Sequence, residues 1–211
     1  MSGKRGQGRP PREENGKGLD KLLEGAREAI RSGPETNVSR QEIARRAGVT
    51  PALVTYYFPD QDELIRSATW PTVQEAIARL EDVLGSDGSY EIRLKGLIAL
   101  FIDFTARNSR ILDAFIETTG RSKDPESGRQ IMTALKSLTL FFEEAGRDGV
   151  WRGFDPTFFL FAVWGMCKFV AEPPALPVQM FAHLDHAKLR DAQAGLIADL
   201  LVNGIRKADP A

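Results

Sequence analysis

The sequence predicts an all-α protein, and three observations support this fold class. Over most of the 211 residues, apolar side chains recur three and four positions apart, which is the spacing of one helix face. These runs are bounded by capping residues, proline or glycine. No run alternates apolar and polar residues between the hairpin turns that a sheet needs. Hydrophobic residues make up 42% of the chain, enough for a sizeable core, so we expect roughly nine packed helices.

The chain opens on a segment with almost nothing to bury. Residues 1–17 are dominated by Gly, Pro, Arg and Lys, and we expect them to form a flexible basic arm. The first helix follows, and its apolar face consists of Leu19, Leu22, Leu23, Ala26 and Ile30. The Ser-Gly-Pro sequence at residues 32–34 ends this helix.

A second, short helix is expected to begin at Arg40. Ser39 and Glu42 have the spacing of a capping box. In such a box the Ser39 side chain accepts a hydrogen bond from the Glu42 amide, and the Glu42 side chain returns to the Ser39 amide. Gly48 ends the helix, because glycine readily adopts the left-handed conformation that closes one.

A third helix is predicted over residues 51–57. Thr50 supplies a hydroxyl cap, and Pro51 stands at the first helical position, where its missing N–H costs no hydrogen bond. The pair Phe58-Pro59 ends the helix, because the residue before a proline disfavours helical backbone angles.

Helices this short are unstable alone in water, so packing must hold them. We expect the inward side to be formed by Val49, Leu53, Val54 and Phe58, against Ile43, Ala44 and Leu64. The outward side is then formed by Thr50, Ala52, Thr55 and Tyr56. Two helices joined by a tight glycine turn are typical of the helix-turn-helix, whose second helix enters the major groove of DNA. The alternative is a pair of short helices in an ordinary bundle.

The remaining helices are longer and are expected over residues 64–84, 92–106, 111–118, 131–142, 158–170 and 189–205. Asp60 caps the first of these. The Asp-Pro pairs at 124–125 and 155–156 each combine an N-cap acceptor with proline at the first helical position. Pro71 lies inside an expected helix, and we expect it to kink that helix.

The stretch IARRAGVTPALVTYYFPDQDELI, residues 43–65, resembles the DNA-binding signature of the TetR family of bacterial transcriptional regulators. The resemblance covers residues 19–65. It implies a homodimer in which a three-helix DNA-binding domain, residues 18–65, precedes an effector-binding and dimerisation domain, residues 66–211. The stretch FDPTFFLFAVWGMCKFV, together with YYFP, resembles the subgroup that includes the pyrimidine-utilisation regulator.

The resemblance also implies which residues contact DNA. Ser39 and Arg40 would lie beside phosphates at the start of the positioning helix. The recognition helix would carry Thr50, Pro51, Ala52, Thr55 and Tyr56. Tyr57 would touch the phosphate backbone.

Two positions depart from the family pattern. Thr55 stands where the family commonly has Tyr, which removes or shortens one phosphate contact. Gln61 replaces the usual Lys at the start of the fourth helix, so a charged phosphate contact is lost.

The basic arm offers a replacement for that charge. Residues 1–12 hold four basic and no acidic side chains, whereas residues 59–211 carry a net charge of −5 within a chain of net charge −1. Such an arm suits a polyanion at this end. Arg9-Pro10 resembles in part the AT-hook core that reads the minor groove. General attraction to phosphate and a solvated tail are the alternatives.

Aromatic side chains are concentrated after residue 64, where they fit either a core or an apolar effector cavity. The candidate effector-binding residues are Phe101, Thr105, Trp164 and Lys168. Lys168 either extends to the surface or meets an anionic effector or a carboxylate, for which Asp103 is a candidate.

The last expected helix has an apolar stripe that suits a homodimer interface or internal packing. The stripe consists of Leu196, Ile197, Leu200, Leu201 and Ile205.

Other classes of protein have little support. Phosphate-loop and nucleophile-elbow motifs are absent, so we expect no catalytic residues, no enzyme and no cofactor. His183 and His186, with Asp185 between them, have the spacing of a metal pair, but the chain has only two His, and we expect no metal site. The single Cys167 excludes an internal disulfide and fits a reducing cytosol as a buried residue.

The apolar run 158–170 falls short of the roughly 20 residues that cross a membrane, and the N-terminus lacks a secretory signal. We therefore expect a cytoplasmic regulator that binds a double-stranded DNA operator and an unknown small-molecule effector. The alternatives are control by a partner protein and, less favoured, a small helical enzyme.

Overall fold

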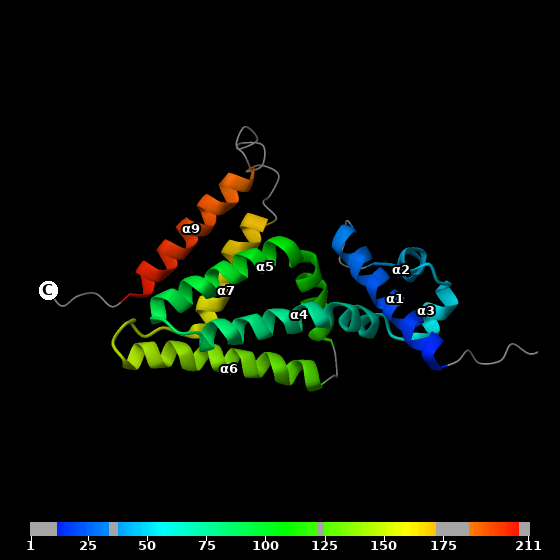
Figure 1. The fold of residues 1–211 in the computed structure, drawn as a ribbon, viewed down its shortest axis with the longest axis horizontal. Helices are drawn as coiled ribbons and strands as arrows, with labels where there is room; N and C mark the ends of the chain where they lie inside the picture. Colours follow the sequence, from blue (N-terminus) through cyan, green and yellow to red (C-terminus); the bar gives the residue numbers. More distant parts are fainter. Residues whose placement is uncertain (1–11, 34–37, 122–124, 172–185, 207–211) are drawn as a thin grey trace, which may run out of the picture. The chain divides into compact units, whose positions relative to one another are not determined.

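The computed structural model describes residues 12–33, 38–121, 125–171 and 186–206. These contain eight helices and no strand, apart from one isolated bridge between Trp151 and Arg206. The all-α prediction is therefore confirmed. The helices are α1 (Arg12–Ser32), α2 (Arg40–Ala47), α3 (Pro51–Tyr57), α4 (Gln61–Gly85), α5 (Tyr90–Thr119), α6 (Pro125–Arg147), α7 (Pro156–Ala171) and α9 (His186–Ile205) (Figure 1).

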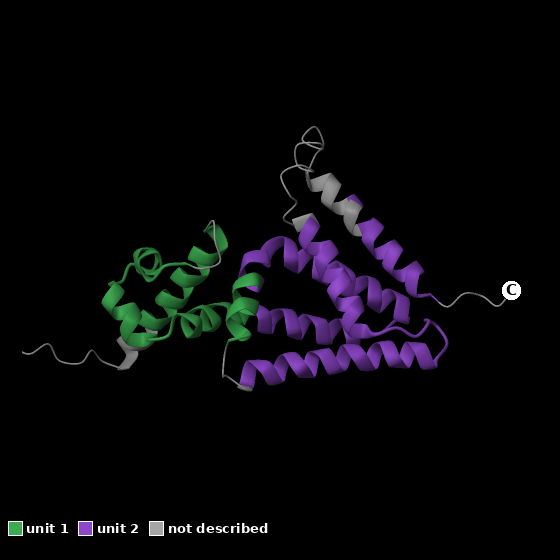
Figure 2. Ribbon diagram, turned by 180° about the vertical axis from the view of Figure 1, so that it is seen from behind, with its two compact units in different colours: residues 1–71, 113–122 green, residues 72–112, 123–211 purple. Residues whose placement is uncertain are grey.

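The chain divides into two compact units, coloured separately in Figure 2. The first unit comprises residues 1–71 and 113–122, and the second comprises residues 72–112 and 123–211. The first unit thus includes the last turns of α5, which follow α3 by more than fifty positions in the sequence. Sequence periodicity did not predict that residues 113–122 belong to the first unit, because it locates helices along the chain but does not show which helices pack together.

In the first unit α1 packs against α2, and α2 packs against α3 (Figure 1). The core includes Leu22, Ile30, Ile43, Val54 and Leu64, all of them fully buried. The expected inward residues are therefore confirmed at Ile43, Ala44, Val54, Phe58 and Leu64, whereas Val49 and Leu53 are only half-buried.

A close approach between α1 and α2 depends on Gly25. A Cβ built on Gly25 would lie only 2.7 Å from the backbone nitrogen of Ala47. Real Cβ atoms essentially never come that close to another heavy atom. The two helices can pack at this spacing only because Gly25 has no side chain.

The last turns of α5 complete the first unit. Trp70 of α4 stacks on Phe115 of α5 with ring centroids 5.6 Å apart. Arg27 of α1 donates from Nε to the carbonyl oxygen of Ala68 in α4, at 2.9 Å. These contacts fix the part of α4 that follows α3.

The core of the second unit is rich in aromatic rings. Tyr90, Phe141, Phe142 and Trp151 lie with ring centroids between 5.4 and 5.8 Å apart. Around this cluster pack helices α5, α6, α7 and α9, with Leu94, Ile98, Leu138, Ile197 and Ile205 among the buried residues. Cys167 is also buried, and burial raises the pKa of its thiol to about 11, as expected for an inert core residue.

One sequence expectation needs correction, and two others compare with the structure as follows. α1 begins at Arg12, so residues 12–17 of the expected arm are helical, because extending a formed helix costs less than starting one. The helices expected at 92–106 and 111–118 together correspond to α5, whose backbone is non-helical at Asn108 and kinks there, in the gap between the two expected ranges. As predicted, Pro71 lies inside a single long helix, α4, and the kink expected there stays a prediction.

Candidate nucleic-acid interface

Helix α2 is capped at both ends as expected. The Ser39 hydroxyl accepts from the Glu42 amide at 3.2 Å, and Gly48 closes the helix with φ of 65°. The other half of the capping box does not form. Glu42 instead accepts hydrogen bonds from Arg45 and Arg46, at distances down to 2.6 Å. Those bonds lower the pKa of Glu42 to about 2, because they stabilise the carboxylate.

Helix α3 follows α2 after the three residues 48–50, and its start is held by Thr50. The Thr50 hydroxyl accepts from the Leu53 amide at 3.3 Å, and Pro51 occupies the first helical position. At the other end the Phe58 amide donates to the carbonyl oxygen of Val54 at 2.9 Å. Val54 and Phe58 are buried, so they anchor α3 against the rest of the first unit.

The opposite side of α3 is open to solvent. Its exposed residues are Thr50, Pro51, Ala52, Thr55 and Tyr56, and we call them the exposed face of α3. Tyr56 is the most exposed large side chain among them, at 71%. Tyr57 is half-buried, and its ring meets that of Tyr56 edge to face. The structure thus brings together the residues that sequence reasoning placed on a recognition helix.

Arg40 has a role that sequence reasoning missed. Its guanidinium donates to four neutral acceptors, none of them on its own helix. These are Gln61 Oε1 at 3.0 Å, Thr55 Oγ1 at 3.2 Å, Phe58 O at 2.8 Å and Pro59 O at 2.6 Å. The Gln61 amide in turn donates to the carbonyl oxygen of Val38 at 2.6 Å. No spacing rule in the sequence signals this network, because its members are up to 23 positions apart and meet only in the folded unit.

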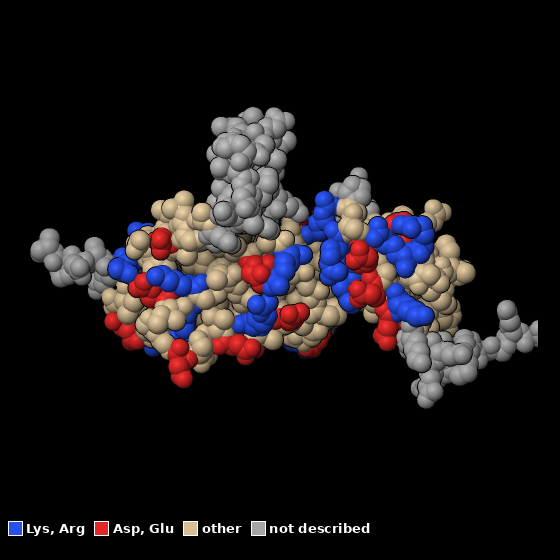
Figure 3. All heavy atoms as spheres, turned by 45° about the horizontal axis from the view of Figure 1, so that its top comes forward, with Lys and Arg blue, Asp and Glu red and all other residues tan. Residues whose placement is uncertain are grey.

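The charges of α2 are therefore unevenly neutralised. Arg45 and Arg46 both pair with Glu42, and Arg46 also lies 3.7 Å from Glu28. Within the described residues, Arg40 makes no ion pair with a carboxylate. On the face shown in Figure 3, basic and acidic side chains are interspersed over the described surface. Of the three basic residues of α2, Arg40 is thus the one whose charge no carboxylate neutralises within the described residues.

The start of α4 is also fixed. Asp60 accepts from the Asp62 amide at 2.9 Å, which confirms Asp60 as the cap. Asp62 forms a bidentate ion pair with Arg121, which lies two residues after the end of α5, and the two hydrogen bonds measure 2.7 and 3.1 Å. The hydrogen bond from Arg121 holds the pKa of Asp62 below its ordinary value.

Comparison with known protein families identifies this arrangement. Residues 22–68 match the family model described as bacterial regulatory proteins, tetR family. This segment is a tetR-family domain. The tetR-family domain runs from within α1 to the first turns of α4, and α2 and α3 form its helix-turn-helix. The narrower resemblance to the pyrimidine-utilisation regulator is not confirmed and stays a prediction.

Solved structures show that the likeness extends to the overall fold. A tetR-family regulatory protein from a Rhodococcus strain matches with a TM-score of 0.68 and 17% identity, over 92% of this chain and 99% of that chain. A tetR-family regulator from Marinobacter aquaeolei matches with a TM-score of 0.64 and 13% identity, over 94% of this chain and 100% of that chain. A TetR transcriptional regulator from Streptomyces coelicolor matches with a TM-score of 0.54 and 22% identity, over 90% of this chain and 99% of that chain. These neighbours are regulators, not enzymes. No curated protein gave a significant match.

The predicted effector residues lie on two helices outside the tetR-family domain. Phe101 and Thr105 are on α5, and Trp164 and Lys168 are on α7. Thr105 is buried, with 4% of its surface exposed, and the other three are half-buried. Asp103, a candidate partner for Lys168, instead pairs with Arg107 and lies 3.7 Å from Arg79.

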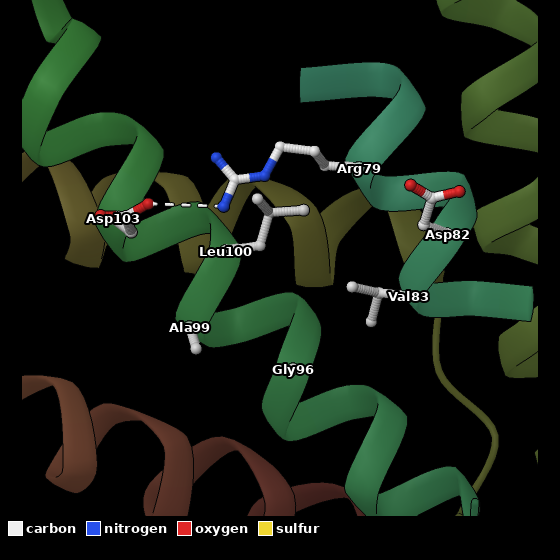
Figure 4. Close-up of a pocket in the computed structure, with 7 residues that line it drawn as sticks. All are labelled: Arg79, Asp82, Val83, Gly96, Ala99, Leu100 and Asp103. Atoms are coloured by element: carbon white, nitrogen blue, oxygen red, sulfur yellow. Dashed lines mark ion pairs between the residues drawn. The ribbon is translucent and has the colours of Figure 1, made fainter. Parts of the chain in front are cut away.

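A groove of about 440 Å³ lies between α4 and α5 (Figure 4). Three of its lining residues are charged, namely Arg79, Asp82 and Asp103. The others are small or branched apolar residues: Val83, Gly96, Ala99 and Leu100. None of the predicted effector residues lines this groove. Periodicity could not locate it, because the groove depends on how two helices face each other.

The second unit also exposes apolar side chains on α7 and α9. They are Phe158, Phe161 and Phe169 of α7 with Leu196 and Leu200 of α9, each at least half exposed. We call these five residues the apolar face. The predicted stripe on the last helix is thus divided, since Ile197 and Ile205 are buried in the core.

Two sequence expectations concern residues that are only partly described. His183 and the arm residues Arg9 and Pro10 lie outside the described residues. In the portion that is described, no cluster of three or more His, Cys, Asp or Glu side chains could hold a metal ion. Among the described helices, none combines the length and apolar character needed to span a membrane.

Proposed function

We propose that the protein is a sequence-specific DNA-binding transcriptional regulator, a repressor that acts as a homodimer and leaves its operator when a small effector binds. The main support for this proposal is the exposed face of α3. It presents small, hydroxyl-bearing and aromatic side chains while Val54 and Phe58 hold the helix from behind. A helix held in this way can enter the major groove as a rigid element and contact base edges.

The residues around α3 supply the contacts to the DNA backbone. Ser39 and Arg40 lie at the start of α2, and Tyr57 and Gln61 lie where α3 leads into α4. Contacts to phosphates orient a protein on the duplex, whereas contacts to base edges select the sequence. We assign the phosphate contacts to these four residues and the contacts to base edges to the exposed face of α3.

A second copy of the chain is the proposed occupant of the apolar face on α7 and α9. Exposed apolar patches of this kind mark interaction sites. Gly165 of α7 and Gly195 of α9 are exposed beside the apolar face and have open space around them, so a facing helix can approach closely. A symmetric dimer places two recognition helices on successive major grooves, roughly 34–36 Å apart.

The groove between α4 and α5 is the proposed effector site. Its volume of about 440 Å³ suits a small molecule, and its lining offers apolar contacts beside charged groups. We infer an effector that has an apolar body and a charged group. Effector binding acts on DNA affinity only if it favours a conformation that binds the operator less tightly. Since the operator is genomic, the regulator acts in the cytoplasm.

The test is selection of operators from random duplexes. The purified full chain is mixed with a library of short random duplexes at two salt concentrations, and the retained DNA is sequenced. Enrichment of one palindrome is the expected result, since a symmetric dimer reads two half-sites. Retention that is sensitive to salt but selects no sequence would overturn sequence-specific regulation and leave only attraction to phosphate.

A further inference from the structure

The two hydroxyl groups on the exposed face of α3 differ in their hydrogen bonds. A hydroxyl has one hydrogen to donate and two lone pairs that accept. Thr55 Oγ1 donates to the carbonyl oxygen of Pro51 at 3.2 Å and accepts from Arg40 Nη1 at 3.2 Å. Thr50 Oγ1 accepts from the Leu53 amide, and no acceptor for its hydrogen is found among the described residues. The hydroxyl hydrogen of Thr55 is therefore already used in a hydrogen bond within α3, whereas the hydroxyl hydrogen of Thr50 can be donated to a base.

Arg40 holds the Thr55 side chain in this arrangement. Besides its bond to Thr55, the Arg40 guanidinium donates hydrogen bonds to Gln61, Phe58 and Pro59, and these three bonds fix its position. Rotating the Thr55 hydroxyl towards DNA would break the bond from Arg40 and the bond to Pro51. With the hydroxyl turned back onto its own helix, the methyl group is the part of Thr55 left to meet a base.

We propose that Arg40 positions Thr55 so that it reads a thymine through its methyl group, while Thr50 reads its base through its hydroxyl. The inference rests on the proposed function, that is, on α3 entering the major groove. Thymine is the only DNA base that presents a methyl group there, and apolar contact with that methyl distinguishes it from the other bases. Thr55 is thus a specificity-determining residue and Arg40 a positioning residue.

The experiment removes one methyl group at a time from each side of the contact. Each thymine of the selected operator is replaced in turn by deoxyuridine, which lacks only the C5 methyl. Kd is measured for the wild type, Thr55→Val and Thr55→Ser. Valine keeps the methyl and replaces the hydroxyl by a second methyl, whereas serine keeps the hydroxyl and loses the methyl. Thr55 is exposed, so neither change should disturb folding.

We expect one thymine in each half-site at which deoxyuridine weakens wild-type binding by about fourfold, the effect of burying one methyl group. Thr55→Val should show the same loss at that position, and Thr55→Ser should show none. The inference is overturned if Thr55→Ser keeps the loss, if Thr55→Val abolishes it, or if no thymine is sensitive. In the last case an enriched operator would leave the proposed function standing, whereas failure to enrich any operator overturns both.

Arg40→Lys tests the positioning role. Lysine keeps the positive charge but lacks the forked donors that reach several acceptors at once. We expect the slope of log Kd against log salt to stay the same, while the discrimination of thymine from deoxyuridine falls. An unchanged discrimination would show that Thr55 does not need Arg40. A melting curve checks folding, and if this variant unfolds, the Thr55 variants still decide the inference.

Discussion

Arg121 and Asp62 join two segments that are 59 positions apart in the sequence. The guanidinium donates to both carboxylate oxygens, and this bond lowers the pKa of Asp62 from its ordinary value. The pair therefore attaches the turn that follows α5 to the first turn of α4, directly after the helix-turn-helix. It stabilises the folded tetR-family domain as long as Asp62 is ionised.

Asp62→Asn should lower the melting temperature in a pH-dependent way. A carboxyl group whose pKa is lower in the folded state contributes stability above its unfolded pKa and loses it as the pH falls through its folded pKa. We expect the difference from the wild type to be present at neutral pH and to disappear in acid. Glu63→Gln, one position further along α4, is the control for loss of a charge. A difference that persists unchanged into acid would contradict the role of the ion pair.

Gly25→Ala should destabilise the tetR-family domain. The new Cβ would lie 2.7 Å from the backbone of Ala47, so α1 and α2 must move apart. Overpacking of this kind costs about 1–3 kcal/mol. Gly128→Ala is the matched control, because Gly128 is helical and has nothing within 4 Å of an added Cβ. There alanine should stabilise the helix by up to about 1 kcal/mol. Urea unfolding followed by circular dichroism measures both, and equal effects would contradict the prediction.

Tyr57→Ala and Thr50→Ala should weaken DNA binding in different ways. We expect Tyr57→Ala to reduce affinity for operator and random duplexes alike, because a phosphate contact carries no sequence information. Thr50→Ala should reduce affinity for the operator more than for random DNA. It also removes the cap of α3, at a cost of about 1 kcal/mol, so Thr50→Ser, which keeps a hydroxyl, is the control. Equal losses on both kinds of duplex for both alanine variants would reject the assignment.

Leu200→Asp should separate the proposed dimer into monomers. Leu200 belongs to the apolar face and is 61% exposed, so a charge there is tolerated in a monomer but not in a packed interface. Leu140→Asp on α6 is the control, since Leu140 is 53% exposed and lies outside the apolar face. Sedimentation measures the mass of each variant. A wild-type monomer, or dimers that persist in Leu200→Asp, would refute the proposed interface.

Ala99→Trp should block the groove between α4 and α5. Ala99 lines the groove and is exposed, so a large side chain can fill the space without entering the core. We expect this variant to bind operator normally and to resist release by any compound that releases the wild type. Ala106→Trp, at an exposed position of α5 outside the groove lining, is the control. Release that is unaffected by Ala99→Trp would place the effector elsewhere.

Local structure in this protein was largely readable from the sequence. The Ser39 cap, the left-handed Gly48, and the start of α3 at Thr50-Pro51 were all predicted and are confirmed. Each depends on backbone geometry and on hydrogen bonds between residues that are three or four positions apart. Such signals are complete within a short stretch of chain.

Only the tertiary structure decided how these elements act together. Arg40 was predicted beside a phosphate, yet the fold makes it the centre of a network that joins α2 to the end of α3 and the start of α4. The addition of residues 113–122 to the first unit and the groove between α4 and α5 were equally invisible in the sequence. The physical reason is that these features depend on contacts between residues far apart in the chain, whose geometry is set by how whole helices pack.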